Sequence, residues 1–127
     1  HAVGIDIDPE AIKVAEQAAA DTGVNVEVFE ADVSTAKGSF DTALMNPPFG
    51  AQTKHADRPF IEKALQVAHR TYSLHNDGTE AFVEKLVSSL GGASLPVKRY
   101  KFEIPYAFEF HRKATESVSV VLLRFER

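Results

Sequence analysis

An apolar run that ends in two successive prolines is the strongest constraint on the fold of this 127-residue chain. Residues 43–45 (Ala-Leu-Met) are typical of the end of a buried strand, and Asn46-Pro47-Pro48-Phe49-Gly50 follows directly. The prolines end the strand because proline cannot donate to a sheet ladder and fixes its own φ. Asn46 is therefore expected at the C-terminal tip of a strand. An amide, a rigid carbonyl and an aromatic ring suit a flat group that carries an NH₂, and an ordinary Asn-capped turn is the competing interpretation.

The hydrophobic periodicity predicts alternating strands and helices. Asp8 and Pro9 mark one helix start and Gly23 its end, and Asp57 is expected to cap the second helix. Gly91 and Gly92 end the last helix. Strands are predicted over residues 2–7, 24–29, 40–45, 71–75, 97–104 and 118–123, and helices over 9–22, 58–68 and 81–90. The last two strands are expected to form an antiparallel pair joined through residues 108–113. Such alternation indicates an α/β fold with a mostly parallel sheet.

Composition narrows the class of protein further. The chain is 44% hydrophobic and 25% charged, which is ordinary for a globular domain, and it has no cysteine. A disulfide framework and a thiolate metal site are therefore excluded, a cytoplasmic location is favoured, and no membrane partner is expected. Residues 1–50 carry a net charge of −7 and residues 51–127 a net charge of +3. The second part is therefore better suited to a polyanion such as nucleic acid.

Two aspartates lie at the C-terminal ends of the first two predicted strands, as Asn46 lies at the end of the third. Asp6 lies in the first strand and Asp32 comes just after the second. Because ligands of open α/β sheets bind at the carboxyl ends of the strands, these side chains are candidate ligand contacts. A carboxylate there can accept from ribose hydroxyls or from an adenine amino group. Asp8 is interpreted as a helix cap, and Asp32 has a competing interpretation as a cap before Ser34.

At these positions the sequence resembles the class I S-adenosylmethionine-dependent methyltransferases. The likeness rests on Gly4-Ile5-Asp6-Ile7-Asp8, Glu30-Ala31-Asp32 and Asn46-Pro47-Pro48-Phe49. Residues 45–50, 72–75 (Tyr-Ser-Leu-His) and 110–113 (Phe-His-Arg-Lys) are also similar to the archaeal and eukaryotic small-subunit rRNA adenine-N6 methyltransferases, the methyltransferase-like protein five family. The resemblance implies a Rossmann-like class I methyltransferase sheet, mostly parallel, with a C-terminal antiparallel hairpin.

The resemblance also implies which residues bind the cofactor, S-adenosylmethionine. Asp6 and Ile7 correspond to residues at the ribose, and Asp32 and Val33 to residues at the adenine. Asn46 is expected to lie beside the cofactor as well as beside the substrate.

The catalytic residues implied are Asn46, Pro47, Pro48 and Phe49. Asn46 through its side-chain oxygen and Pro47 through its carbonyl would accept the two hydrogens of the target N6 amine. Phe49 would stack on the flipped-out base. Methyl transfer would then be an in-line displacement in which positioning is the main catalytic contribution.

The family carries a first strand and a glycine-rich cofactor loop that are not found before His1. We therefore expect residues 1–127 to be a partial methyltransferase domain, without the central strand between that of Asp6 and that of Asn46. This fragment alone is expected to be inactive. The family also implies RNA as a partner, specifically rRNA, and a small zinc-containing activator subunit.

Two other classes of function stay open. An amino methyltransferase could act on guanine N2, on DNA adenine N6 or on a protein glutamine, because each presents a planar NH₂ group. A non-catalytic RNA-binding domain could retain the same fold.

Basic residues give candidate RNA contacts, with a solvated surface as the competing interpretation. They are Lys54 and Arg58, at the loop predicted over residues 50–56, and His111-Arg112-Lys113 in the predicted hairpin bend. His75 is expected to be a buried, hydrogen-bonded histidine. The histidines show no metal-ligand spacing, and the sequence predicts no Ser-His-Asp arrangement.

Overall fold

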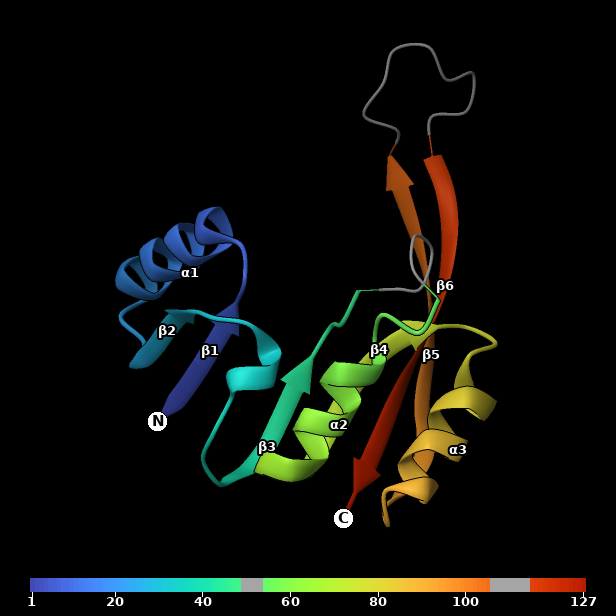
Figure 1. Cartoon of the computed structure of the whole chain (residues 1–127). Coiled ribbons are helices and arrows are strands. Elements are labelled where there is room, and N and C mark those ends of the chain that lie inside the picture. Colours follow the sequence, from blue (N-terminus) through green and yellow to red (C-terminus); the bar gives the residue numbers. More distant parts are fainter. Residues whose placement is uncertain (49–53, 106–114) are drawn as a thin grey trace. The chain divides into compact units, whose positions relative to one another are not determined.

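The computed structural model describes residues 1–48, 54–105 and 115–127 (Figure 1). The chain forms two compact units, residues 1–38 and residues 39–127. The predicted catalytic Phe49 and the candidate RNA-binding residues His111, Arg112 and Lys113 lie outside the described residues.

Residues 1–38 form a small β-α-β unit. Strands β1 (Ala2–Asp6) and β2 (Val26–Glu30) pair in parallel, with Ala2 opposite Val26 and Asp6 opposite Glu30. Helix α1 (Pro9–Thr22) connects them, and a short 3₁₀ helix, η1 (Val33–Thr35), follows β2. The predicted cap is confirmed, because the Asp8 carboxylate accepts the Glu10 amide at 2.9 Å. Gly23 ends α1 with φ 68°, a left-handed conformation that glycine adopts without steric cost.

Residues 39–127 form a four-stranded mixed sheet with two helices. The strands are β3 (Phe40–Met45), β4 (Ala68–Asn76), β5 (Ala93–Pro105) and β6 (Thr115–Glu126), and the helices are α2 (Arg58–Val67) and α3 (Glu80–Ser89). The order in the sheet is β3-β4-β6-β5. β3 and β4 are parallel, whereas β6 runs antiparallel to both β4 and β5. The predicted α/β fold and the C-terminal antiparallel pair are confirmed.

The core of this larger unit is formed by one face of the sheet and the apolar sides of α2 and α3. It contains Ile61, Ala64 and Leu65 of α2, Val83, Leu86 and Val87 of α3, and Val121, Leu123 and Phe125 of β6. The three β6 residues are two positions apart because successive side chains of a strand point to opposite faces of the sheet. Gly92 lies against this core so closely that an added Cβ would be 2.8 Å from the Glu126 carbonyl oxygen.

Several predicted boundaries are wrong. Ala68 was assigned to the second helix, but α2 ends at Val67 and Ala68 is the first residue of β4. The three strands β4, β5 and β6 are longer than predicted, because pairing with a neighbouring strand extends them beyond their most β-prone residues. Pro96 is tolerated in β5 because this strand lies at the edge of the sheet and its register shifts there.

The prediction that a further central strand separates the strand of Asp6 from that of Asn46 stays a prediction. Within the described residues, β1 and β3 belong to different sheets.

Candidate functional site

The tip of β3 carries the Asn46-Pro47-Pro48 segment, as predicted. The strand ends at Met45, Asn46 is exposed, Pro47 is buried and Pro48 is exposed. Side chains alternate between the two faces of a strand. Met45 accordingly packs against the hydrophobic core, while Asn46 follows Leu44 on the opposite face. The buried proline anchors the tip and leaves the Asn46 amide accessible.

Asn46 lines an open hollow on the face of the sheet opposite α2 and α3. The other lining residues are Leu44, Met45, Tyr72, Leu74 and Leu122, and the hollow has a volume of about 370 Å³. Leu44 is 80% exposed. The hollow therefore combines one amide with mostly apolar side chains, which is the usual make-up of a site for a flat organic group.

The smaller unit places Asp6 at the end of β1 and Asp32 just after β2. Asp6 accepts the Asp8 amide at 2.9 Å, and Asp32 accepts the Ser34 amide at 2.8 Å. Both side chains are exposed, and both follow parallel strands that end at the same edge. The competing interpretation of Asp32 as a cap is confirmed, since it stands at the N-cap of η1. The Asp32 carboxylate is nevertheless exposed.

Ser34 also affects the ionisation of Asp32. Interaction with the Ser34 hydroxyl, and next with the Ser34 amide, lowers the pKa of the Asp32 carboxyl. The side chain is thus an anionic acceptor at neutral pH. Of the other predicted cofactor residues, Ile7 is exposed beside Asp6, and Val33 is half-buried as the first residue of η1.

A buried chain of hydrogen bonds lies beside the tip of β3. Ser73 Oγ is 2.7 Å from His75 Nε2, and His75 Nδ1 is 3.2 Å from Asp57 Oδ2. The exposed fractions of Ser73, His75 and Asp57 are 0%, 1% and 8%. Because a carboxylate only accepts, His75 Nδ1 carries the hydrogen and Nε2 accepts from the Ser73 hydroxyl. This arrangement confirms the prediction of a buried, hydrogen-bonded histidine.

The sequence did not predict that Ser73, His75 and Asp57 would meet, since Asp57 is remote from β4 in the chain. The order of contacts is that of a Ser-His-Asp nucleophile. A nucleophile must reach its substrate, however, and Ser73 is fully buried. Burial is also the main cause that lowers the pKa of His75, with Asp57 opposing it. The three residues are therefore structural and not a hydrolytic site.

Asp57 was predicted to cap α2, and this prediction is only half right. Asp57 stands at the N-cap position, but its side chain makes no capping hydrogen bond. Its carboxylate instead binds His75, while its backbone carbonyl accepts from the Phe60 and Ile61 amides. Just before it, His55 has φ 61° and stacks on Phe82 of α3 with the ring centroids 4.0 Å apart.

The candidate RNA-binding residues that are described lie at the start of α2. Lys54 is exposed in the turn before the helix. Arg58 is the first residue of α2, and its Nε is 2.8 Å from Glu62 Oε1 one turn later. Ion pairs of this kind between exposed side chains are weak. The ion pair with Glu62 therefore holds the Arg58 guanidinium only weakly.

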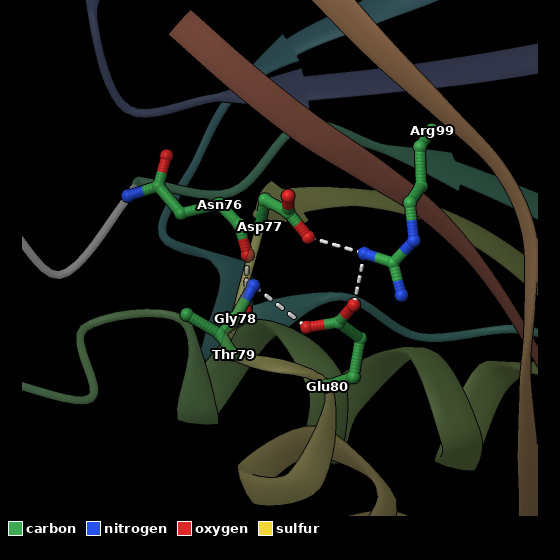
Figure 2. A network of polar contacts seen from close by, with 6 residues as sticks. All are labelled: Asn76, Asp77, Gly78, Thr79, Glu80 and Arg99. Carbon is green, nitrogen blue, oxygen red and sulfur yellow. Dashed lines mark hydrogen bonds and ion pairs between the residues drawn. The ribbon is translucent and has the colours of Figure 1, made fainter.

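A second polar cluster closes the turn between β4 and α3 (Figure 2). The Arg99 guanidinium on β5 pairs with both Asp77 and Glu80, and Glu80 also accepts the Gly78 amide at 2.7 Å. Interaction with Glu80 is the main cause that raises the pKa of Arg99. Arg99 is thus engaged by two carboxylates and links β5 to this turn.

Among residues 1–48, 54–105 and 115–127, no group of three or more His, Asp or Glu side chains is placed to bind a metal ion. None of the described helices has the length and apolar character needed to cross a bilayer.

Comparison with known proteins identifies the family of this chain. A family model described as the methyltransferase small domain matches residues 1–93. The family model and the fold together define an α/β methyltransferase domain. The chain belongs to the methyltransferase small domain family.

Three similar proteins share this architecture or sequence. The uncharacterised protein MJ0284 of Methanocaldococcus jannaschii is 37% identical over all of this chain and 64% of its own length. The rRNA N6-adenosine-methyltransferase Mettl5 of Drosophila melanogaster is 34% identical over 98% of this chain and 62% of its own length. The crystal structure of PH1948 from Pyrococcus horikoshii, provisionally named an RNA methyltransferase, has a TM-score of 0.83 and 37% identity, covering 98% of this chain and 62% of that one. The chain thus spans less than two thirds of the length of these relatives.

Proposed function

We propose that the full-length protein transfers a methyl group from S-adenosylmethionine to the exocyclic N6 of an adenosine in RNA, specifically in small-subunit rRNA. The observation that carries this proposal is the tip of β3, where a buried Pro47 anchors an exposed Asn46 at the edge of an apolar hollow. The similarity to a protein named as an rRNA N6-adenosine methyltransferase supports the choice of substrate.

The residue types at the tip explain how an unreactive amine can be methylated. The N6 lone pair of adenine is delocalised into the ring, so the nitrogen is a poor nucleophile. Two acceptors on its hydrogens, the Asn46 side-chain oxygen and the Pro47 carbonyl, favour a pyramidal nitrogen whose lone pair points away from them. The proton can leave to water after transfer. No general base is needed, and the nearby His75 is buried with both ring nitrogens occupied.

We infer that the smaller unit contributes acceptors for the cofactor. When bound, S-adenosylmethionine supplies an electrophilic methyl group on a sulfonium. Asp6 would accept from the ribose hydroxyls, with Ile7 beside it, and the anionic Asp32 would accept from the adenine amino group, with Val33 against the ring. The glycine-rich loop expected from the family resemblance would complete the pocket in the full-length protein. Cofactor affinity should therefore be much lower for residues 1–127 than for the full-length protein.

RNA binding would use cations at the start of α2. Lys54 is exposed, and the weak Arg58–Glu62 ion pair leaves a guanidinium available for phosphate. His111, Arg112 and Lys113 remain candidates by sequence alone. A cytoplasmic location stays part of this proposal, because the chain contains no cysteine.

A small zinc-containing activator subunit is also part of the proposal. Among the described residues β2 pairs with β1 alone, which leaves one edge of β2 available for a further strand. Val24, just before this edge strand, is 58% exposed, and Phe29, within it, is 49% exposed. Isolation of the intact enzyme as a stable and fully active monomer would contradict this part.

The proposed activity can be tested with tritiated S-adenosylmethionine and the full-length protein. Small-subunit rRNA, adenine-containing duplex DNA and a glutamine-bearing release factor are offered in parallel. We expect label only in the rRNA. Label only in protein or DNA would reject the RNA substrate, and no label in any of them, with cofactor binding intact, would favour a non-catalytic RNA-binding domain.

A further inference from the structure

The buried hydrogen bonds beside the β3 tip connect two elements of the larger unit, β4 and the start of α2. Ser73 is the register partner of Met45, the last residue of β3. If this register continued by two residues, it would set His75 opposite Pro47. The hydrogen bonds run from Ser73 to His75 and on to Asp57 at the N-cap of α2. They therefore join the strand beside the Asn46 tip to the start of the helix that follows this tip in the chain.

The connection uses two polar side chains, Asp57 and His75, in a way that their local structure does not require. An aspartate at an N-cap ordinarily accepts a backbone amide of its own helix, which stabilises the helix. Asp57 makes no such bond and turns its carboxylate to β4 instead. His75 is 1% exposed, so its two ring nitrogens have no access to water and depend on these partners. Departures of this kind from local rules are typical of functional regions.

A second contact fixes the same segment. The His55 ring stacks on Phe82 of α3, and the His55 carbonyl accepts the Arg58 amide at 3.1 Å. Residues 55–58 are thus attached to α3 through one ring and to β4 through one carboxylate. The start of α2 cannot shift relative to β4 without breaking at least one of these contacts.

We propose that Ser73, His75 and Asp57 are positioning residues that hold the Asn46-Pro47 tip in the geometry needed for methyl transfer. This inference rests on the proposed function. None of the three touches the substrate, since all are on the buried side of the sheet, whereas Asn46 lines the open face. Their role is to attach the start of α2 to β4, the strand that pairs with β3, so that the two acceptors of the tip stay aligned on the amine.

The chain offers a matched pair of variants to test this role. Ser73→Ala removes the hydroxyl that donates to His75. Thr71→Val removes another hydroxyl on the same buried side of β4, and Thr71 Oγ1 has no hydrogen-bond partner among the described residues. Both side chains are no more than 1% exposed. Both variants therefore lose a buried hydroxyl, but only Ser73→Ala also loses the hydrogen bond to His75.

The first measurement does not depend on activity. Amide hydrogen exchange around Asn46 is followed by NMR in the full-length protein under native conditions. Relative to the wild type, Ser73→Ala should speed exchange at residues 45 and 46 by about threefold to tenfold, the effect of losing one buried hydrogen bond. Thr71→Val should leave these rates unchanged. Equal rates in the two variants would overturn the positioning role.

The second measurement separates positioning from folding. If methyl transfer is observed, Ser73→Ala should lower kcat by about threefold to tenfold with an unchanged KM for S-adenosylmethionine. His75→Gln, which retains one donor and one acceptor, should recover most of the kcat lost in His75→Leu. A loss that only follows the fraction of folded protein, or no recovery by glutamine, would contradict the inference. If the wild type transfers no methyl group at all, the proposed function fails, and the exchange rates still decide whether the connection holds the tip.

Discussion

The two units of this chain hold their candidate ligand residues by different means. In residues 1–38, Asp6 and Asp32 are each held by a backbone amide only two residues further along the chain. In residues 39–127, the Asn46 tip has a buried proline and lies beside hydrogen bonds that connect β4 with α2. The two units also differ in how many hydrophobic side chains they bury. Among the residues described, Ile12 is the one buried hydrophobic residue of the smaller unit, whereas the larger unit has a core.

The difference shows which candidate residues depend on tertiary packing. Local turns can orient an aspartate even where the surrounding unit buries little apolar area. A strand tip that must place two acceptors on one amine needs support from several elements. Variants in the smaller unit should therefore change cofactor affinity, whereas variants near the tip should change the rate of the chemical step.

The largest effect is expected for Asn46→Ala. Loss of one of the two acceptors on the target amine should lower kcat by about a hundredfold or more, with little change in stability because Asn46 is exposed. Single-turnover methyl transfer and thermal unfolding of the full-length protein measure the two quantities. Thr42→Ala, an exposed change on the same side of β3, is the control and should retain full activity.

Asp6→Ala tests the role of a carboxylate in the smaller unit. Loss of the carboxylate that we propose accepts from the ribose hydroxyls should weaken S-adenosylmethionine binding by about tenfold to a hundredfold. Asp8→Ala, only two residues away, removes the α1 cap and should reduce stability by about 1 kcal/mol without affecting cofactor affinity. Calorimetric titration of both variants checks this. Equal losses of affinity in the two would show that the turn, and not the Asp6 carboxylate, matters.

A pair of glycine substitutions compares the packing of the two units. In Gly92→Ala the new Cβ would be 2.8 Å from the Glu126 carbonyl and 3.0 Å from Val87 Cγ1. We expect a loss of about 1–3 kcal/mol of unfolding free energy from overpacking. In Gly4→Ala the nearest atom, Val28 Cγ1, is 3.8 Å away, an ordinary contact distance. Urea unfolding of the full-length variants should show a much smaller change for Gly4→Ala.

The smallest effect concerns pH. Burial lowers the pKa of His75 below its usual value, with the nearby Asp57 carboxylate opposing the shift. The unfolded chain then binds a proton more readily than the folded chain, so this histidine stabilises the fold fully only above its unfolded pKa of about 6.5. The stabilisation should fall as the pH drops below that value.

Between about pH 7.5 and about pH 5.5 we expect the free energy of unfolding to fall, as measured by urea unfolding. His75→Gln cannot titrate and should show a shallower dependence on pH over the same range. An identical dependence in the wild type and in His75→Gln would assign the effect to other groups.

The sequence predicts what depends on neighbouring residues and misses what depends on distant ones. The Asp8 cap, the Gly23 stop and the strand that ends at Met45 follow from residue types within a few positions of each other. The meeting of Asp57 with His75 does not, because it depends on how α2 packs beside β4. For the same reason Asp57 was assigned a capping bond that it does not make.

Periodicity also fails where one element passes directly into another. Ala68 continues the apolar spacing of α2, and only its parallel pairing with Phe40 assigns it to β4. The ends of β5 and β6 depend on each other in a similar way, since their register runs from Ala93 opposite Glu126 to Pro105 opposite Thr115. No local feature of either strand indicates so long a pairing.

The most direct test of the proposed chemistry identifies the product nucleoside. The full-length wild type and Asn46→Ala are each incubated with small-subunit rRNA and S-adenosylmethionine, and the digested RNA is analysed by mass spectrometry. We predict N6-methyladenosine with the wild type and almost none with Asn46→Ala. Methylation of guanosine, or equal amounts of N6-methyladenosine with both proteins, would contradict the assignment of the β3 tip as the site that holds the adenine amine.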